Sequence, residues 1–361
     1  MRVKFLAKTS PDQDPALWTS LFPNGKPVID GCEFVFDLDA KNYDWLVVYE
    51  GLPPLKNEKK INRVEPLSCA RSNTILITTE PSSIRLDGPW FMRQFGYVLT
   101  NKASELVRKG GHIKQTPPLR WFYGRPMGVN NMSGSGIQPV NEYMTYDTLA
   151  ERPPMPKTKD LSTVCSTKKM AHTVHAKRYE FVMALRERMP ELSVYGRGIN
   201  PIDEKSEAMD DYRYHLAIEN HIESGHWTEK LSDSFLAYCL PFYFGDPDYA
   251  AAFPRNSVIP INIYNLGEAE AIIRRAIAEN AYEKRLPDIL KARELVLTEH
   301  NLMIRIARII NARANFPKAN TQEFIYGRHI FRKKFPLKAA SDALFRTRMR
   351  KHPKASPLQL K

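Results

Sequence analysis

The stretch Tyr212–Gly245 limits the possible folds of this chain more than any other part of the sequence. It begins with a short apolar run that ends on a carboxylate, His215–Glu219, and a polar loop, Asn220–Trp227, follows. Thr228 can cap a helix in which apolar residues recur at helical spacing, and a second apolar run, Leu240–Phe244, precedes Gly245. This order of strand, loop, helix and strand is typical of α/β proteins. In them, a loop that enters a helix N-terminus lines a ligand crevice and favours phosphate.

Two pairs of polar residues flank that loop, Glu219-Asn220 and Glu229-Lys230. Lys230 falls in the first helical turn, where the helix dipole disfavours a cation, so the sequence suggests a nearby anion such as a diphosphate. The Glu229 carboxylate could accept hydrogen bonds from ribose hydroxyls. The Asn220 amide suits a sugar hydroxyl because it both donates and accepts. An ordinary capping pattern with surface charges is the alternative.

Arg178 is a second candidate for anion binding. It lies at the start of an expected helix, Lys177–Arg188, directly after the loop Lys168–Ala176. Cations from two neighbouring strand–helix units could reach one diphosphate. A lone arginine at a helix start is, however, also common on solvated surfaces.

Motifs of several other enzyme classes are absent. The sequence has no GxxxxGK[ST] loop, no GxGxxG, no HExxH and no GxSxG. Asp37-Leu38-Asp39 has the flanks of a surface turn, so we do not expect a Mg²⁺-dependent Asp-x-Asp site for a nucleotide sugar. The four cysteines are widely spaced, which disfavours structural zinc and suggests reduced, buried thiols: Cys32, Cys69, Cys165 and Cys239.

The sequence alternates between strands and helices in both halves, which predicts two parallel, doubly wound domains. Strands are expected at Val3–Ala7, Cys32–Phe36, Trp45–Tyr49, Thr74–Thr79, Tyr97–Thr100, Leu161–Ser166, Leu192–Tyr195 and Val258–Ile263. Helices are expected at Ala103–Lys109, Gly267–Asn280, Ala281–Asn301 and Leu302–Ala314. Glycines and prolines between Met127 and Lys159 predict a loop and linker. We therefore expect an N-terminal domain over 1–156, with that loop at 127–158, a C-terminal domain over 157–314 and a basic tail over 315–361.

Most of the positive charge lies near the C-terminal end. The net charge is +13, and residues 313–361 hold 13 basic and 2 acidic residues, so the body is close to neutral. Such a basic end favours binding to an anionic lipid surface or a nucleic acid, or it is simply solvated. Ala339–Lys351 could form an amphipathic basic helix that docks on a membrane or folds back on the protein. With no signal peptide or apolar run of spanning length, we expect a cytoplasmic protein, either free or peripheral on the inner membrane face.

Five segments carry a resemblance to a known family: AIENHIESGHWTEKL followed by LAYCLPFYFGD, VCSTKK, AKRYEFVMAL, SVYGRG, and, more thinly, TILITTEPSSIRLDGPWFMRQFGYVLT. They resemble glycosyltransferase family 10, the bacterial-type α-1,3/4-fucosyltransferases. The family signature is F-E-N, a short loop, T-E-K, a helix and a Pro-containing strand that ends in Gly. This chain has Ile218 in place of the Phe.

The resemblance implies a GT-B fold, in which two Rossmann-like domains face each other across a cleft, with the acceptor on the N-terminal side. It implies an α-1,3-fucosyltransferase-like enzyme with GDP-fucose as donor and an N-acetylglucosamine-containing glycan as acceptor. Transfer to O3 of that sugar, inversion at the anomeric carbon and independence of any metal or other cofactor are expected with it.

The resemblance also assigns roles. Glu80 is the expected general base. Arg178 and Lys230 would bind the diphosphate, Asn220 the fucose and Glu229 the ribose. The remaining residues expected at the donor site are Glu219, His226, Trp227, Tyr195 and Gly196, although Trp227 could equally be a core residue.

Two alternatives stay open. The same fold could use another GDP-linked hexose. In a different class, the chain could be an anionic-surface or nucleic-acid binding protein that acts through its basic end, where aromatic and cationic residues alternate. No RNA-binding motif accompanies that end, so we expect no nucleic-acid partner.

Overall fold

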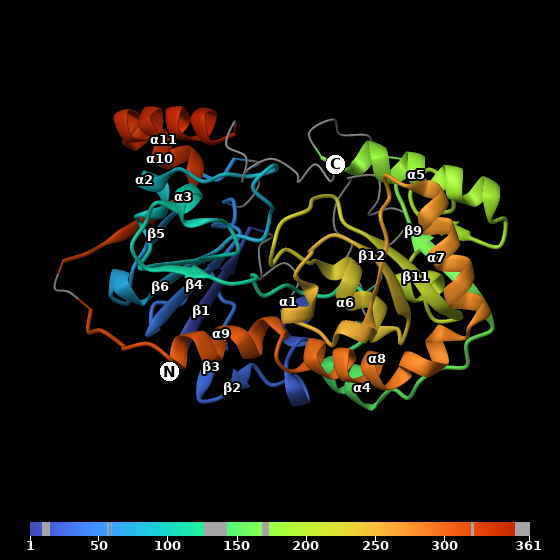
Figure 1. Cartoon of the computed structure of the whole chain (residues 1–361). Helices are drawn as coiled ribbons and strands as arrows, with labels where there is room; N and C mark the ends of the chain where they lie inside the picture. Colours follow the sequence, from blue (N-terminus) through green and yellow to red (C-terminus); the bar gives the residue numbers. More distant parts are fainter. Residues whose placement is uncertain are drawn as a thin grey trace. The chain divides into compact units, whose positions relative to one another are not determined.

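A computed structural model describes residues 1–8, 15–55, 58, 60–125, 143–167, 173–318 and 321–350. These residues form two compact units (Figure 1). Unit 1 comprises Met1–Pro118 together with the described residues from Leu302 onward, and unit 2 comprises Leu119–Asn301. The predicted α/β class is confirmed, because both units are built on largely parallel sheets.

The predicted domain boundary near Pro156 is wrong. The chain before it already packs in unit 2, where the Tyr123 hydroxyl donates to Asp210 at 2.6 Å and Leu149 is fully buried. The expected linker contains a helix, α4 (Tyr146–Glu151), capped by the Thr145 side chain. Residues 127–142 of the predicted loop lie outside the described residues.

The sheet of unit 1 has seven strands in the order β2-β3-β1-β4-β6-β7-β8, parallel except for the β2–β3 pair. They are β1 (Arg2–Ala7), β2 (Val28–Ile29), β3 (Cys32–Val35), β4 (Trp45–Tyr49), β6 (Thr74–Ile77), β7 (Tyr97–Thr100) and β8 (His112–Lys114). Strands β4 and β6 are buried along their whole length, as continuous apolar runs in a parallel sheet are. The helices of unit 1 are α1 (Pro15–Thr19), α2 (Pro89–Met92), α3 (Ser104–Val107), α9 (Leu302–Asn311), α10 (Arg328–Lys334) and α11 (Pro336–Met349).

The chain after unit 2 returns to unit 1 (Figure 1), so the predicted separate tail over 315–361 is wrong for its described part. Strand β14 (Phe324–Tyr326) pairs antiparallel with β5 (Val64–Pro66), and α11 packs against α2. This segment belongs to the fold because its apolar residues complete the core, with Ile325 fully buried. The expected amphipathic helix within 339–351 is confirmed by α11. It folds back on unit 1, where its Asp342 and Met349 are buried.

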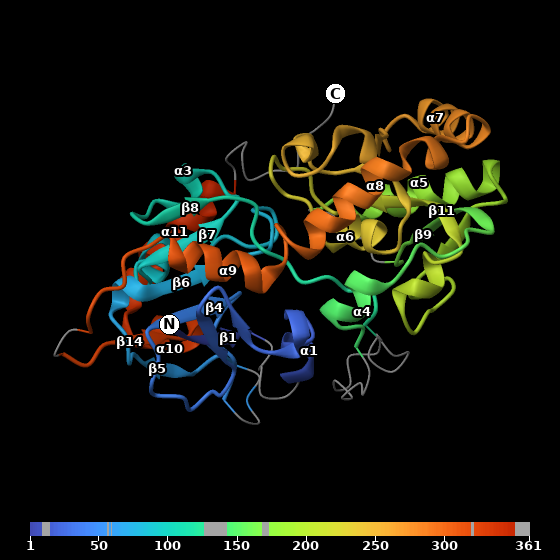
Figure 2. The ribbon, with the colours of Figure 1, turned by 90° about the horizontal axis from the view of Figure 1, so that it is seen from below.

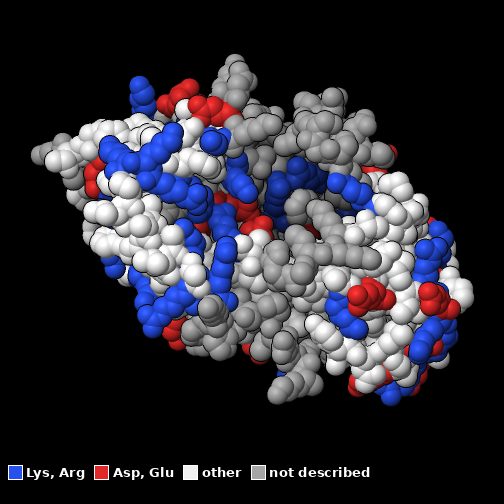
Figure 3. Space-filling model, turned by 90° about the horizontal axis from the view of Figure 1, so that it is seen from above, with Lys and Arg blue, Asp and Glu red and all other residues white. Residues whose placement is uncertain are grey.

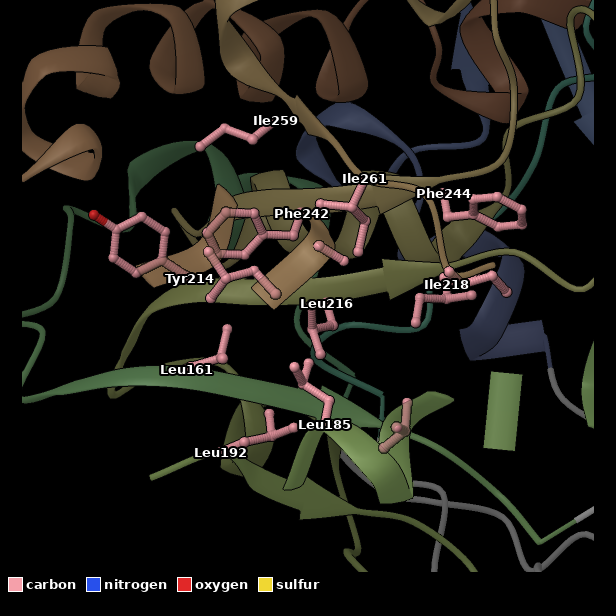
Figure 4. Close-up of a cluster of buried hydrophobic side chains, with 14 of the residues drawn as sticks. Leu161, Leu185, Leu192, Tyr214, Leu216, Ile218, Phe242, Phe244, Ile259 and Ile261 are labelled. Atoms are coloured by element: carbon pink, nitrogen blue, oxygen red, sulfur yellow. The ribbon is translucent and has the colours of Figure 1, made fainter. Parts of the chain in front are cut away.

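The sheet of unit 2 has five parallel strands in the order β10-β9-β11-β12-β13. They are β9 (Lys159–Val164), β10 (Ser193–Tyr195), β11 (Tyr212–Ile218), β12 (Leu240–Phe244) and β13 (Ile259–Pro260). Helices α5 (His175–Arg188) and α7 (Leu266–Ala278) pack together, as do α6 (Glu229–Leu236) and α8 (Ala281–Leu297), so helices cover both faces (Figure 2). Alternate side chains of β9, β11 and β12 meet in one core beneath α5, as Figure 4 shows for Leu161, Leu216 and Phe242 with Leu185.

Candidate functional site

The strand order of unit 2 predicts where a ligand binds. In the strand order, β10 lies next to β9 toward one edge of the sheet, whereas β12 lies next to β11 toward the opposite edge. The connections that leave β9 and β11 therefore run in opposite directions across the sheet. In such doubly wound sheets the carboxyl ends of the two central strands form a crevice. The loops that leave β9 and β11 at this edge lead to α5 and α6, which begin at His175 and Glu229.

Glu219 organises the loop that leaves β11. Its carboxylate is almost fully buried and accepts hydrogen bonds from the Thr228 amide at 2.8 Å and from the Thr228 hydroxyl at 2.7 Å. Thr228 in turn caps α6, since its side-chain oxygen accepts from the Lys230 amide at 3.3 Å. Because both Glu219 oxygens are engaged by this turn, the geometry gives Glu219 a positioning role, rather than direct contact with a ligand.

Glu229 and Lys230 form a charged pair at the start of α6. The Lys230 ammonium lies 3.0 Å from Glu229 and 3.5 Å from Glu219. Burial alone would lower the pKa of Lys230, but the two carboxylates outweigh it and raise the pKa. Burial would raise the pKa of Glu229, but the positive charge of Lys230, aided by Lys205, lowers it. Both groups are therefore charged at neutral pH, and each side chain is about one fifth exposed, so a ligand can reach them.

Arg178 and Asn220 lie beside this pair with unused hydrogen-bonding atoms. Arg178 is buried in the first turn of α5, and its Nε has no hydrogen-bond partner among the described residues. Its positive charge lowers the pKa of Lys230, whereas the charges of Glu219 and Glu229 raise it. The Asn220 side-chain oxygen is also buried without a described partner, while its backbone oxygen accepts from Val174 at 3.0 Å and joins the two loops. The structure thus brings together the two predicted cations and the predicted amide.

Tyr195 and Gly196 shape the adjacent strand end. The Tyr195 hydroxyl lies 2.8 Å from that of Tyr212. Gly196 has φ +126°, and a Cβ there would lie 2.3 Å from the Cys165 carbonyl oxygen at the end of β9. Glycine is therefore required for β10 to turn this close to the crevice.

His226 and Trp227 are packed inside unit 2. Each is about 2% exposed. The Trp227 ring lies 5.0 Å from that of Phe253 and 5.1 Å from that of His300, and the His226 ring lies 5.9 Å from that of His221. For Trp227 these contacts favour the core-packing alternative. Donor contact by either side chain stays a prediction.

A buried ion pair beneath α6 has no signal in the sequence. The Lys205 ammonium lies 2.6 Å from Asp233, which is fully buried and also accepts from the Phe122 amide at 3.0 Å. Asp233 thus ties two other segments of unit 2, those of Lys205 and Phe122, to α6. Lys205 belongs to a polar connection without a motif, so sequence reasoning could not find it.

A second Asp-x-Asp sequence, Asp246-Pro247-Asp248, follows β12. Asp246 is buried and accepts from the amides of Gly225 and Asp248 at 3.0 and 2.9 Å. Burial raises the pKa of Asp246 to about 6. Its hydrogen bonds are those of a turn. In the described residues no three His, Cys, Asp or Glu side chains are grouped to hold a metal.

Unit 1 carries a second group of charges at the carboxyl edge of its sheet. Glu80 follows β6, and its pKa is raised by burial and then by the negative charge of Glu50. Arg85 and two lysines, Lys8 and Lys102, oppose this rise. Glu50 accepts a hydrogen bond from the Thr79 hydroxyl and follows β4 with φ +63°. Glu50 was not predicted, although it ends the apolar run WLVVY as Glu219 ends HLAI.

The predicted base and the predicted donor residues lie in different units. Glu80 belongs to unit 1, whereas Arg178, Asn220, Glu229 and Lys230 belong to unit 2. Their joint action stays a prediction. Among the described residues no helix is long and apolar enough to cross a membrane.

Part of unit 2 matches a known protein family. Residues 154–281 match the family model described as glycosyltransferase family 10 (fucosyltransferase) C-term. An α-(1,3)-fucosyltransferase of Helicobacter pylori, FucT, is 30% identical over 69 residues, which are 19% of this chain and 14% of that protein, about one seventh of its length. A crystal structure of an α1,3-fucosyltransferase with GDP-fucose is similar with TM-score 0.45 and 15% identity over 89% of this chain and 93% of that one. A DNA-modifying β-glucosyltransferase is similar with TM-score 0.46 and 8% identity over 86% of this chain and 99% of that one. The family match covers β9 to α7 and the four polar residues of the crevice, and it identifies residues 154–281 as the C-terminal domain of glycosyltransferase family 10.

Proposed function

We propose that this chain is an inverting, metal-independent glycosyltransferase that moves L-fucose from GDP-fucose to a hydroxyl of a glycan acceptor. The observation that carries the proposal is the pair of cations, Arg178 and Lys230, held at the central strand ends of a family 10 domain. In this proposal the two units form a GT-B enzyme. In this proposal the acceptor hydroxyl is O3 of an N-acetylglucosamine residue, and the Helicobacter pylori relative is named an α-(1,3)-fucosyltransferase.

The residues of unit 2 would stabilise the leaving group. Negative charge develops on the GDP diphosphate as the bond to fucose breaks, and fixed cations lower the energy of that transition state. Arg178 is fixed by burial, and Lys230 is fixed by the carboxylates of Glu219 and Glu229. They can supply this stabilisation without a metal. Asn220 offers an unused oxygen to the sugar, and Glu229 would accept from the ribose.

The residue of unit 1 would activate the acceptor. An inverting transfer needs one general base on the face opposite the leaving group. Glu80 suits this role because burial and the Glu50 charge raise its pKa, so that its carboxylate takes a proton more readily than an exposed glutamate.

A donor assay tests the proposal. Transfer from GDP-fucose should proceed in EDTA, and Lys230→Ala should bind GDP roughly ten- to hundredfold more weakly, since charge-assisted hydrogen bonds to the diphosphate are lost. Calorimetry measures the affinity. Lys291→Ala is the control, because Lys291 is an exposed lysine of α8 paired with Glu294.

Unchanged GDP affinity in Lys230→Ala would refute the assignment of the donor site. Loss of transfer in EDTA would point to a metal-dependent reaction instead. Transfer from a different GDP-linked hexose, with none from GDP-fucose, would keep the site and change the sugar.

We also propose an accessory contact with an anionic membrane surface through α11. Leu337 and Leu344 are 85% and 73% exposed and lie two turns apart on one face of this helix. The adjacent exposed side chains include Lys338 and Arg348, and apolar residues flanked by cations favour anionic bilayers. Binding of an anionic surface or a nucleic acid through the basic end is less favoured as the main function, because β14, α10 and α11 are part of the unit 1 fold.

Sedimentation with anionic vesicles tests this contact. The double variant Leu337→Ser, Leu344→Ser should bind vesicles severalfold less than the unmodified chain, because the apolar contribution is removed while the charge is kept. Ala343→Ser, at an exposed position of the same helix, is the control. Equal sedimentation of the double variant and the control would rule out docking through this face.

A further inference from the structure

Unit 1 contains a hollow between α2, α10 and α11 that plays no part in the proposed transfer reaction. It has an empty volume of about 290 Å³, which includes space open to solvent. Its walls include Phe91, Arg328, Phe331, Arg332, Asp342 and Arg346. Figure 3 shows lysine and arginine side chains gathered over this part of unit 1, at the left of the view.

The carboxylates at the hollow are already engaged. The two oxygens of Asp342 accept from the amides of Trp90 and Phe91, each at 2.9 Å, at the start of α2. A Cβ at Gly88 would lie 2.0 Å from the Asp342 carboxyl carbon, so glycine is needed for this contact. Asp87, next to the lining residue Gly88, pairs with Arg328 and, at 3.4 Å, with Arg85.

The guanidinium groups at the hollow are not all engaged. Arg328 uses one terminal nitrogen on Asp87, but its Nη2 is buried with no hydrogen-bond partner among the described residues. The side chains of Arg332 and Arg346 make no ion pair or hydrogen bond with any described residue. Burial and then the charge of Arg332 lower the pKa of Arg346, against the opposite effect of the Asp342 and Asp87 charges. The hollow therefore holds a surplus of positive charge with unused donors.

We propose that this hollow binds the phosphoryl group of a phosphate monoester. Arginine forks match the oxygens of phosphate, and a dianion would compensate the two unpaired cations and give Arg328 Nη2 an acceptor. A single carboxylate would compensate only one charge. The phosphoryl group could belong to a soluble metabolite or to a lipid headgroup. This site is separate from the donor crevice, which lies in unit 2, and it does not rest on the proposed function.

Titration of the full chain with inorganic phosphate tests the site. In calorimetry, Arg332→Gln and Arg346→Gln should each bind phosphate about tenfold or more weakly than the unmodified chain, because a charge-assisted interaction is lost. Arg348→Gln is the matched control, since Arg348 lies on α11 but outside the hollow. Phosphate bound in the donor crevice contributes equally to all variants, so only the difference between them reports on the hollow.

Thermal unfolding gives a second readout. In phosphate-free buffer, Arg346→Gln should unfold at the same or a higher temperature than the unmodified chain, because the repulsion with Arg332 is gone. Added phosphate should raise the unfolding temperature of the unmodified chain more than that of this variant. If Arg346→Gln does not fold, the exposed Arg332→Gln provides the same comparison.

Binding to lipid vesicles distinguishes a lipid headgroup from a soluble metabolite as the source of the phosphoryl group. Stronger binding to phosphatidic acid than to phosphatidylglycerol at equal vesicle charge, lost in Arg346→Gln, would identify a lipid headgroup. Binding of glycerol phosphate without this preference would identify a soluble ligand. Equal phosphate affinity of the unmodified chain, Arg332→Gln and Arg346→Gln would overturn the proposal.

Discussion

Glu80→Gln should abolish sugar transfer while GDP binds with unchanged affinity. An amide cannot take the proton of the acceptor hydroxyl, and loss of a general base costs about 10²- to 10⁴-fold in rate. GDP binding should survive, because the donor residues belong to unit 2 and Glu80 to unit 1. Initial rates with GDP-fucose and calorimetry with GDP measure the two quantities. Glu33→Gln, an exposed carboxylate of β3, is the control.

The pH dependence of the same reaction separates a base from a structural residue. Because the pKa of Glu80 is raised, the rate should fall as pH drops through a higher range than for an exposed glutamate. Glu50→Gln removes a neighbouring negative charge, so it should lower the pKa of Glu80 and move this acid limb to lower pH. Wild-type turnover in Glu80→Gln, or an acid limb that does not move in Glu50→Gln, would remove Glu80 from the role of base.

Asp233→Ala should destabilise the protein by about 3–5 kcal/mol, the largest stability effect that we expect. Removal of one partner of a buried ion pair leaves the other charge buried and uncompensated. Here the Lys205 ammonium, about 9% exposed, would lose the carboxylate 2.6 Å away, and the Phe122 amide would lose its acceptor. Urea unfolding measures the change.

The control for this prediction is Glu294→Ala, which breaks the exposed Lys291–Glu294 pair at the surface of α8. Solvent screens such pairs, so this variant should unfold close to the unmodified chain. An Asp233→Ala protein that is as stable as Glu294→Ala would mean that water or another group compensates Lys205.

The part of the site that depends on local pattern could be predicted from the sequence. The apolar runs give β11 and β12, with Leu240–Phe244 predicted to the residue, and Thr228 caps α6 as its hydroxyl suggests. Arg178, Asn220 and Lys230 could be found because each lies directly next to a strand end or a helix start. These features involve residues close together in the chain, for which periodicity and capping chemistry are sufficient.

The parts that depend on distant contacts could not be predicted. Nothing near Val64–Pro66 indicates that Phe324–Tyr326 is its partner, about 260 residues later. The Lys205–Asp233 pair and the arginine-lined hollow likewise require the tertiary structure, because single charged residues in a sequence are most often solvated. The domain boundary near Pro156 is wrong for the same reason: prolines mark a break in regular structure, but only packing shows which unit a segment joins.

The return of the chain to unit 1 affects how the protein folds during synthesis. Unit 2 is one continuous segment, Leu119–Asn301, and can form its sheet and helices as soon as that segment has left the ribosome. Unit 1 is translated first, but it cannot close until β14 pairs with β5 and α10 and α11 cover its core. Its first strands must therefore wait, partly uncovered, while unit 2 folds. We therefore expect the N-terminal sheet to be the part of the chain most exposed to misfolding during that interval.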